Sequence, residues 1–308
     1  MRRIAVVAVA LLVAVEVFVA YRVITDQPTS AAAPTGTPPT TAPTSAEPEP
    51  TPTTAGPTGT IKLWFAQDGR LFRSWQGTCS TPRRARLDVS SDAGRKFDEV
   101  GLPVLGDPDE PFPETVRAIL GVYPEDDQDI VILASDENCQ THGYQTTDGG
   151  TSWEETDVRQ WHVNADGSEV GRVDMTEPGC TALAVVPLRD SPQNAKVLCS
   201  GGTVVGTNDD GDEWTVLGEL AGAADMTFTS LRDGLAVRRG NACEVEVMDT
   251  ADASGSWDSI SCVLEETDLE PESIAQRGDR VFVQVGGDLY RSDDGGHEWF
   301  KADEPVEE

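Results

Sequence analysis

The chain has 308 residues, enough for one large domain or two of ordinary size. Its 54 acidic residues outnumber 23 basic ones, which gives a formal net charge of −31. This balance argues against nucleic-acid binding, because such proteins need a basic surface to neutralise phosphate, and against docking of the folded body onto anionic lipid. A high negative charge favours solubility and cationic partners, and it says nothing about the fold.

Residues 1–26 predict an export signal that stays in place as a membrane anchor. Arg2 and Arg3 precede an apolar stretch of nearly the 20 residues that span a bilayer as a helix. The two arginines place the N-terminus in the cytoplasm and the rest of the chain outside. The nearest small-residue cleavage site, at residues 31–33, lies well beyond the apolar stretch. Glu16 is costly inside a bilayer, so cleavage and secretion remain the alternative.

Residues 27–60 predict a spacer. Pro, Thr, Ala and Gly dominate this segment, and no residue in it is apolar and large enough to build a core. Such a composition favours a disordered or partly polyproline-like chain. At about 3.1 Å per residue, the segment would hold the following domain up to roughly 100 Å from the membrane.

From residue 61 to residue 308, short strands alternate with turns. The runs DIVILA (129–134), TALAVVP (181–187) and RVFVQV (280–285) are rich in β-branched and aliphatic residues. Gly, Asp, Asn and Pro bound them, which is typical of strands and turns. No long amphipathic helix is expected, so this segment predicts an all-β domain.

One short pattern recurs in this domain: Ser or Thr, then Asp two residues on, Gly two further and an aromatic residue three beyond. The complete copies are Ser90, Asp92, Gly94, Phe97; Thr146, Asp148, Gly150, Trp153; Thr207, Asp209, Gly211, Trp214; and Ser292, Asp294, Gly296, Trp299. A fifth copy, Thr250, Asp252, Trp257, has Ser254 in place of glycine. Successive copies start 56, 61, 43 and 42 residues apart, close to the length of a four-stranded propeller blade.

Each residue type in the pattern suits a tight turn. The hydroxyl and the carboxylate can accept hydrogen bonds from nearby backbone amides. Glycine adopts a backbone conformation that other residues resist, and the aromatic ring buries apolar area beneath the turn. We therefore expect these residues to be structural.

The pattern resembles the Asp box, or bacterial neuraminidase repeat, of sialidases, sortilin-type receptors, some xyloglucanases and propellers related to photosystem II assembly factors. The resemblance covers about residues 61–308. It implies a β-propeller of about five blades, with each box in the turn between the third and fourth strands of a blade. A degenerate sixth blade would fit between Glu155 and Gly179, where the spacing is longest.

All six cysteines follow residue 60, in agreement with export. They are Cys79, Cys139, Cys180, Cys199, Cys243 and Cys262. An even number of dispersed cysteines in an exported domain indicates three disulfides, although six cysteines allow fifteen pairings. The blade arrangement favours Cys180–Cys199 and Cys243–Cys262, each at one edge of a blade, and leaves Cys79 and Cys139 to join the first two blades.

The sequence lacks the residues of a sialidase active site. Those enzymes carry an Arg-Ile-Pro segment near the start of the domain, three arginines, a Tyr–Glu nucleophile pair and an acid/base Asp. No Arg-Ile-Pro segment occurs here, and the only tyrosines beyond residue 60 are Tyr123, Tyr144 and Tyr290. The histidines are scattered, and no HExxH or nucleophile-elbow motif is present. We therefore expect no catalytic residues, no metal and no cofactor.

Two insertions are candidates for binding. The segment 156–179 combines aromatic and basic residues that are typical interface anchors. These are Arg159, Trp161, His162 and Arg172. An extra hairpin that packs on the domain would explain the same residues. The second insertion, 107–114, alternates acidic residues with proline and would attract a cation or a basic partner.

The leading hypothesis is a non-enzymatic binding or assembly module on the extracytoplasmic side of a cell membrane, which it crosses once. Its partner would be a protein or an envelope glycan, with no nucleic acid and with membrane contact only through the N-terminal helix. The alternative is a glycan-active hydrolase, which requires a carboxylate pair across one pocket with at least one perturbed pKa. A purely structural protein with no saturable ligand is the third reading.

Overall fold

The computed structural model describes residues 60–78, 85–105, 114–164, 170–171, 175–188, 191–231, 233–240, 243–250, 256–265 and 267–303. These residues contain strands and no helix, so none of their elements could cross a membrane as a helix. The predicted anchor, the spacer before Thr60 and most of the acidic insertion lie outside the described residues. The anchor and the spacer remain predictions.

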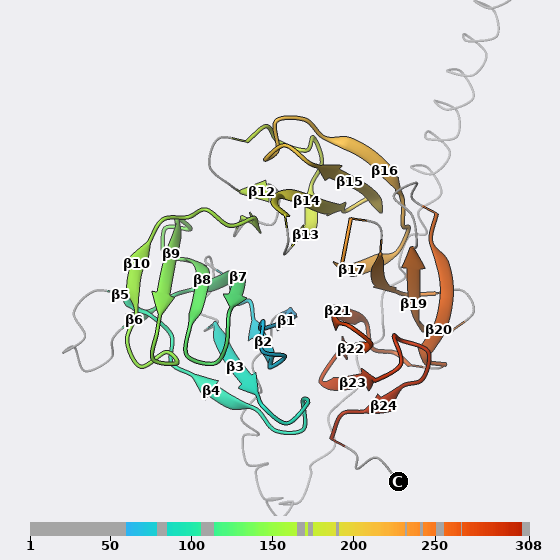
Figure 1. The fold of residues 1–308 in the computed structure, drawn as a ribbon, viewed down its shortest axis with the longest axis horizontal. Helices are drawn as coiled ribbons and strands as arrows, with labels where there is room; N and C mark the ends of the chain where they lie inside the picture. The colour runs from blue at the N-terminus through green and yellow to red at the C-terminus, as the bar shows by residue number, and fades with distance from the viewer. Residues whose placement is uncertain are drawn as a thin grey trace, which may run out of the picture. The chain divides into compact units, whose positions relative to one another are not determined.

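Five four-stranded antiparallel sheets surround a common centre (Figure 1). Blade 1 contains β1 (Ile61–Phe65), β2 (Leu71–Trp75), β3 (Arg86–Ser90) and β4 (Asp98–Val100). Blade 2 contains β7 (Ala118–Pro124), β8 (Ile130–Ser135), β9 (Thr141–Thr146) and β10 (Glu154–Thr156). Blade 3 contains β13 (Ala182–Leu188), β14 (Ser191–Cys199), β15 (Thr203–Thr207) and β16 (Thr215–Glu219). Blade 4 contains β17 (Ala223–Phe228), β18 (Gly234–Arg238), β19 (Val245–Thr250) and β20 (Asp258–Leu264). Blade 5 contains β21 (Pro271–Arg277), β22 (Arg280–Val285), β23 (Asp288–Ser292) and β24 (Phe300–Lys301).

The prediction of an all-β propeller with five blades is therefore confirmed. The long interval between blades 2 and 3 holds a two-stranded hairpin, β11 (His162–Val163) and β12 (Val170–Gly171), where a sixth blade was the alternative. A second small hairpin, β5 (Val104–Leu105) and β6 (Glu114–Thr115), connects blades 1 and 2.

The hydrophobic core lies between neighbouring blades. Ile132 of β8 and Phe72 of β2 belong to one cluster, while Val283 of β22 and Val247 of β19 belong to another. Strands in the middle of a blade are buried on both faces, which is why β8 and β22 read as continuous apolar runs without alternation. Each blade is therefore stable only when a neighbour covers it.

The ring closes between blades 5 and 1 without a shared strand, because every blade consists of four consecutive strands. Side chains of β21 form the closing contacts instead. The carboxylate of Glu272 accepts a hydrogen bond from the backbone N–H of Ile61 (2.7 Å), and Ser273 Oγ accepts one from the N–H of Leu63 (3.0 Å). The first strand of the ring is thus bonded to the first strand of the last blade.

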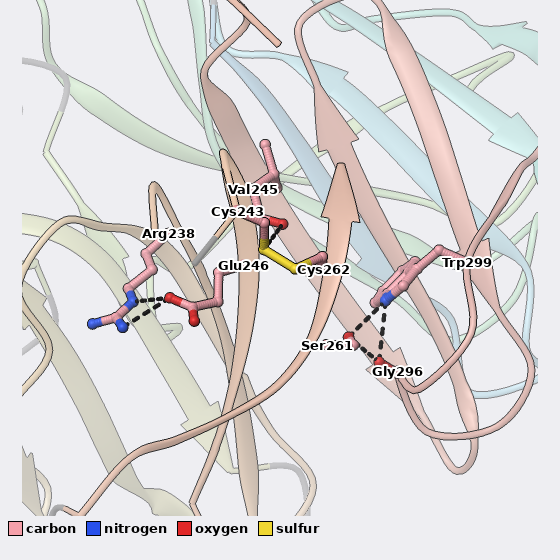
Figure 2. Close-up of a disulfide and its surroundings, with 8 residues drawn as sticks. All are labelled: Arg238, Cys243, Val245, Glu246, Ser261, Cys262, Gly296 and Trp299. Carbon is pink, nitrogen blue, oxygen red and sulfur yellow. Dashed lines mark hydrogen bonds and ion pairs between the residues drawn. A yellow bond between two sulfur atoms is a disulfide. The ribbon is translucent and has the colours of Figure 1, made fainter. Parts of the chain in front are cut away.

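Two of the predicted disulfides are confirmed. Cys180 pairs with Cys199 at a Cα–Cα separation of 5.8 Å. Cys243 pairs with Cys262 at 5.9 Å (Figure 2). Cys262 lies within β20, not after it as the blade model places it. Cys139 is also disulfide-bonded. Its expected partner, Cys79, lies outside the described residues, so that pairing stays a prediction.

Candidate functional site

The recurring Ser/Thr-Asp-Gly-aromatic segments, the box turns, each connect the third and fourth strands of a blade. In the copy of blade 2, Thr146 Oγ1 donates to a carboxylate oxygen of Asp148 (2.8 Å) and accepts from the N–H of Gly150 (3.0 Å). Asp148 also accepts from both the side chain (2.6 Å) and the backbone N–H (2.8 Å) of Ser152. These bonds, led by that from the Ser152 hydroxyl, lower the pKa of Asp148 to about 2. The carboxylate is therefore engaged within its own turn.

The other complete copies have the same geometry. The hydroxyls of Ser90, Thr207 and Ser292 bond to the carboxylates of Asp92, Asp209 and Asp294 at 2.7–2.8 Å and accept the N–H of Gly94, Gly211 and Gly296. In the degenerate copy, Asp252 and Ser254 lie outside the described residues. Its Trp257 packs edge-on against Phe228 of the same blade, with ring centroids 6.0 Å apart.

In blades 2, 3 and 5, the tryptophan of the box turn bonds to the preceding blade or to the segment that leads from it. Trp153 donates its indole N–H to the carbonyl of Gly101 (2.9 Å), and Trp299 donates to Ser261 Oγ (2.9 Å; Figure 2). The glycine two residues after the aspartate makes this approach feasible, because a Cβ at Gly150 would lie 2.6 Å from a side-chain carbon of Val100. The box turns therefore hold neighbouring blades together, a structural role.

The candidate binding residues of segment 156–179 do not form one exposed surface. Trp161 is buried and packs edge-on against Trp214, with ring centroids 5.7 Å apart. His162 is also buried, which lowers its pKa, and its Nδ1 lies 3.1 Å from the carbonyl oxygen of Gln160. Arg159 is exposed and pairs with Asp157 at 2.6 Å. Arg172 lies outside the described residues. The buried pair fits the alternative of a hairpin that packs on the domain.

The first strands of all five blades surround a central cavity of about 1030 Å³. β7 and β13 contribute mainly aliphatic residues to its wall. β1, β17 and β21 contribute apolar and aromatic residues together with the charged or amide side chains of Lys62, Asp225 and Gln276. The sequence gives no local signal for this site, because its wall is assembled from strands that lie far apart in the chain.

A buried ion pair joins two of these strands. Lys62 Nζ of β1 lies 3.0 Å from Asp225 of β17, and their side chains are only 11% and 8% exposed. The second carboxylate oxygen of Asp225 accepts from Ser273 Oγ (2.7 Å) and from the N–H of Ile274 (3.2 Å). Both oxygens of Asp225 are therefore engaged in contacts that connect blades 4, 5 and 1.

A hydrolase needs a carboxylate with a perturbed pKa, and Glu272 of β21 comes closest to meeting this requirement. Burial raises its pKa, and the N–H of Ile61 and the charge of Lys62 partly oppose this effect. However, Glu272 is bonded to Ile61 across the closing seam, and Asp225 is bonded to Lys62, Ser273 and Ile274. The two carboxylates therefore support the ring. In the part of the chain that the structure describes, no group of three or more His, Cys, Asp or Glu side chains could hold a metal ion.

No family model matches the sequence, and no curated protein matches it. Solved structures with a similar fold include one described as YCF48 bound to D1 peptide, with a TM-score of 0.48 and 15% identity over 80% of this chain and 83% of that one. YCF48 from Cyanidioschyzon merolae gives a TM-score of 0.33 and 16% identity over 78% and 68%. The GH74 xyloglucanase from Xanthomonas campestris gives 0.34 and 17% over 79% and 38%. At these identities the likeness concerns the fold, and the assignment as a five-bladed propeller rests on the strand topology of this chain.

Proposed function

We propose that this five-bladed β-propeller is a non-enzymatic binding module that takes part of its partner into the central cavity. The observation that carries the proposal is Leu183 of β13, which is 42% exposed and lines the cavity. Among the described residues, it belongs to none of the hydrophobic clusters between blades. A large apolar side chain that is directed at a cavity and packs against no core is typical of a ligand contact.

The cavity also has the size and composition of a binding site. Its volume of about 1030 Å³ lies near the upper end of typical ligand pockets, and its wall combines apolar and polar groups in similar measure. The charged pair Lys62–Asp225 is neutralised internally and bonded to the ring. This arrangement supports binding over acid–base chemistry.

The cellular setting is part of the same proposal. Residues 1–26 anchor the protein in the membrane, and residues 27–60 carry the propeller away from it on the extracytoplasmic side. The two disulfides support an exported location, because such bonds persist in oxidising compartments.

A glycan-active hydrolase is the second candidate, and the raised pKa of Glu272, beside the cavity, favours it. For this function, Glu272 would have to release the N–H of Ile61 and act on a substrate in the cavity. Both functions can be separated in one experiment.

The full chain in detergent would be immobilised and exposed to envelope extract, and the retained proteins and glycans identified by mass spectrometry. Leu183→Trp places a bulky indole in the cavity and narrows it at β13, whereas Val216→Trp adds the same ring to β16 at a position that is 67% exposed and lies outside the cavity wall. We expect the wild type and Val216→Trp to retain the same ligand and Leu183→Trp to lose it. Equal retention by Leu183→Trp contradicts the cavity as the site, and shortened glycans support the hydrolase.

A further inference from the structure

One wall of the cavity is aliphatic and irregular. The hydrogen-bond ladder between the first and second strands shifts by one residue in four blades, at Leu120, Leu183, Ala224 and Glu272. A β-bulge re-aims the side chain of the extra residue. In β7 and β13 the extra residues are leucines that line the cavity, and Pro187 follows on the same wall. Aliphatic groups of this kind contact aliphatic side chains, and the partly buried aromatic rings of Trp64 and Tyr123 also line the cavity.

Two carboxylates at one mouth of the cavity have no counter-ion. Glu125 and Asp129 follow β7 and line the cavity, and no cation of the described residues lies within ion-pairing distance of either. The turn between them is held in place by its own bonds: Glu125 N–H donates to the carbonyl of Asp129 (2.9 Å), and the carbonyl of Glu125 accepts from Gln67 N–H (2.9 Å) of the neighbouring blade. Their position relative to the cavity is therefore fixed.

The charge of the wall favours a cationic occupant. Among the described residues, those that line the cavity and carry a charge are Glu125, Asp129, Asp225 and Lys62, a formal sum of −2, and the one cation in this set is paired with Asp225. The whole chain carries −31, so its field attracts cations toward the mouth. An acidic ligand would meet repulsion from both sources.

The edges of the first strands favour a ligand with an extended peptide backbone. The first strand of each blade has a single neighbour in its sheet. On the other edge of β1, β7 and β21, the N–H groups of Ile61, Leu63, Ile119 and Ile274 already bond to a neighbouring blade. Within the described residues β13 and β17 make no such bond, so their other edges offer backbone N–H and C=O groups. An extended peptide can use such groups. The first strands contain five to seven residues, so a hexapeptide of about 20 Å matches the depth of the wall.

We infer that the occupant of the cavity is an extended peptide segment of a partner protein in which basic and aliphatic side chains alternate. Its aliphatic side chains contact Leu183 and Pro187, and a basic side chain reaches Glu125 and Asp129. This inference rests on the proposed function, because it names the ligand of the same cavity.

The test is a binding titration of the full chain in detergent with fluorescein-labelled, end-capped hexapeptides at low and high salt. The probes are Lys-Val-Lys-Val-Lys-Val, the same peptide with Gln or Glu in place of Lys, and a hexamer of N-acetylglucosamine as the glycan. We expect the lysine peptide to bind best and to weaken as salt rises, because salt screens exposed charge pairs.

Matched variants locate the contacts. Glu125→Gln with Asp129→Asn removes two charges at the mouth, and Glu213→Gln with Glu219→Gln removes two exposed charges of blade 3 outside the cavity wall. We expect the first pair to weaken the lysine peptide about fivefold to tenfold, as the loss of two exposed ion pairs implies, and the second to change it less than about twofold. Leu183→Ser should weaken all three peptides about tenfold, because one apolar anchor is lost.

Each other outcome overturns the inference. Equal binding of the lysine and glutamine peptides, or equal effects of the two charge variants, excludes a basic segment at this mouth. Binding of the glycan alone, blocked by Leu183→Trp, overturns the peptide ligand and leaves the proposed binding function standing. If no probe binds and the wild type retains nothing from envelope extract, both proposals are wrong.

Discussion

Trp214 donates its indole N–H to the backbone carbonyl of Thr176 at 2.6 Å, and thereby joins the box turn of blade 3 to the segment that leads from blade 2. The same relationship holds for Trp299 and Ser261, which lie an identical 38 residues apart. The recurring turn is thus a contact between blades as well as a corner within one. The indole N–H contributes a hydrogen bond to this contact, and the ring contributes apolar packing.

Trp214→Phe separates these two contributions. The ring stays apolar, but the carbonyl of Thr176 loses its donor, so we expect the free energy of unfolding to fall by about 1 kcal/mol. Chemical denaturation followed by circular dichroism measures this. Trp257→Phe is the control, because the indole N–H of Trp257 has no partner within the described residues. An equal loss in both variants would show that only the ring matters.

Gly211→Ala tests the close approach between blades. Gly211 has a φ of +90°, and a Cβ there would lie 2.9 Å from Met175 Cβ and 3.0 Å from Trp161 Cη2. Gly295 has a similar φ of +79° with no atom within 4 Å of its Cβ position. We expect Gly295→Ala to cost about 1 kcal/mol from backbone strain alone, and Gly211→Ala to cost about 1–3 kcal/mol more from overpacking. Thermal and denaturant unfolding of the two variants give the comparison. Equal costs would mean that the glycine serves the turn only.

Asp225→Asn tests the seam that connects blades 4, 5 and 1. It leaves the ammonium of Lys62 buried with no carboxylate at 3.0 Å, and breaking a buried pair in this way typically costs about 3–5 kcal/mol. Asp157→Asn is the matched control, because it breaks a pair with Arg159 whose side chains are both largely exposed, and should cost less than about 1 kcal/mol. A small effect of Asp225→Asn on denaturant unfolding would show that the closing seam depends on the Ile61 and Leu63 bonds instead.

Asp148→Asn should change the dependence of stability on pH. The pKa of Asp148 lies at about 2 in the folded protein, below its ordinary value of 3.8. A carboxylate with a lowered pKa stabilises the fold above its unfolded pKa, and that contribution disappears as the pH falls through the folded value. We expect the wild type to melt at a higher temperature than the variant near neutral pH, and the difference to shrink between pH 3.8 and about 2. A difference that stays constant down to pH 2 would contradict the role of the ionised carboxylate.

The fold could be predicted because its signal is local. Every residue that shapes a box turn lies within eight consecutive positions, and the intervals between copies match the length of a blade. The Cys180–Cys199 and Cys243–Cys262 pairs could be predicted for the same reason, since each joins a residue just before one strand to a residue in another strand of the same blade, 19 residues apart in both cases.

The site could not be predicted, because it depends on contacts between blades. Lys62 and Asp225 meet only after blade 5 closes against blade 1, and nothing near either residue in the sequence indicates the other. The bulge at Leu183 could not be predicted either. It arises from a shift in the pairing of β13 with β14, and the residues of the run TALAVVP do not indicate it. Trp161 and His162 attracted attention as binding residues because of their type, but burial against Trp214 and the hairpin accounts for them.

The central claim is that the partner enters the cavity between the five blades, and site-specific crosslinking in intact cells tests it most directly. A photoreactive benzoylphenylalanine would replace Leu183 inside the cavity or Val216 on the outer strand of blade 3, in the full-length chain. The account predicts a single crosslinked species from position 183, identified by mass spectrometry, and none from position 216. The same species from position 216, or no crosslink from position 183, would contradict it.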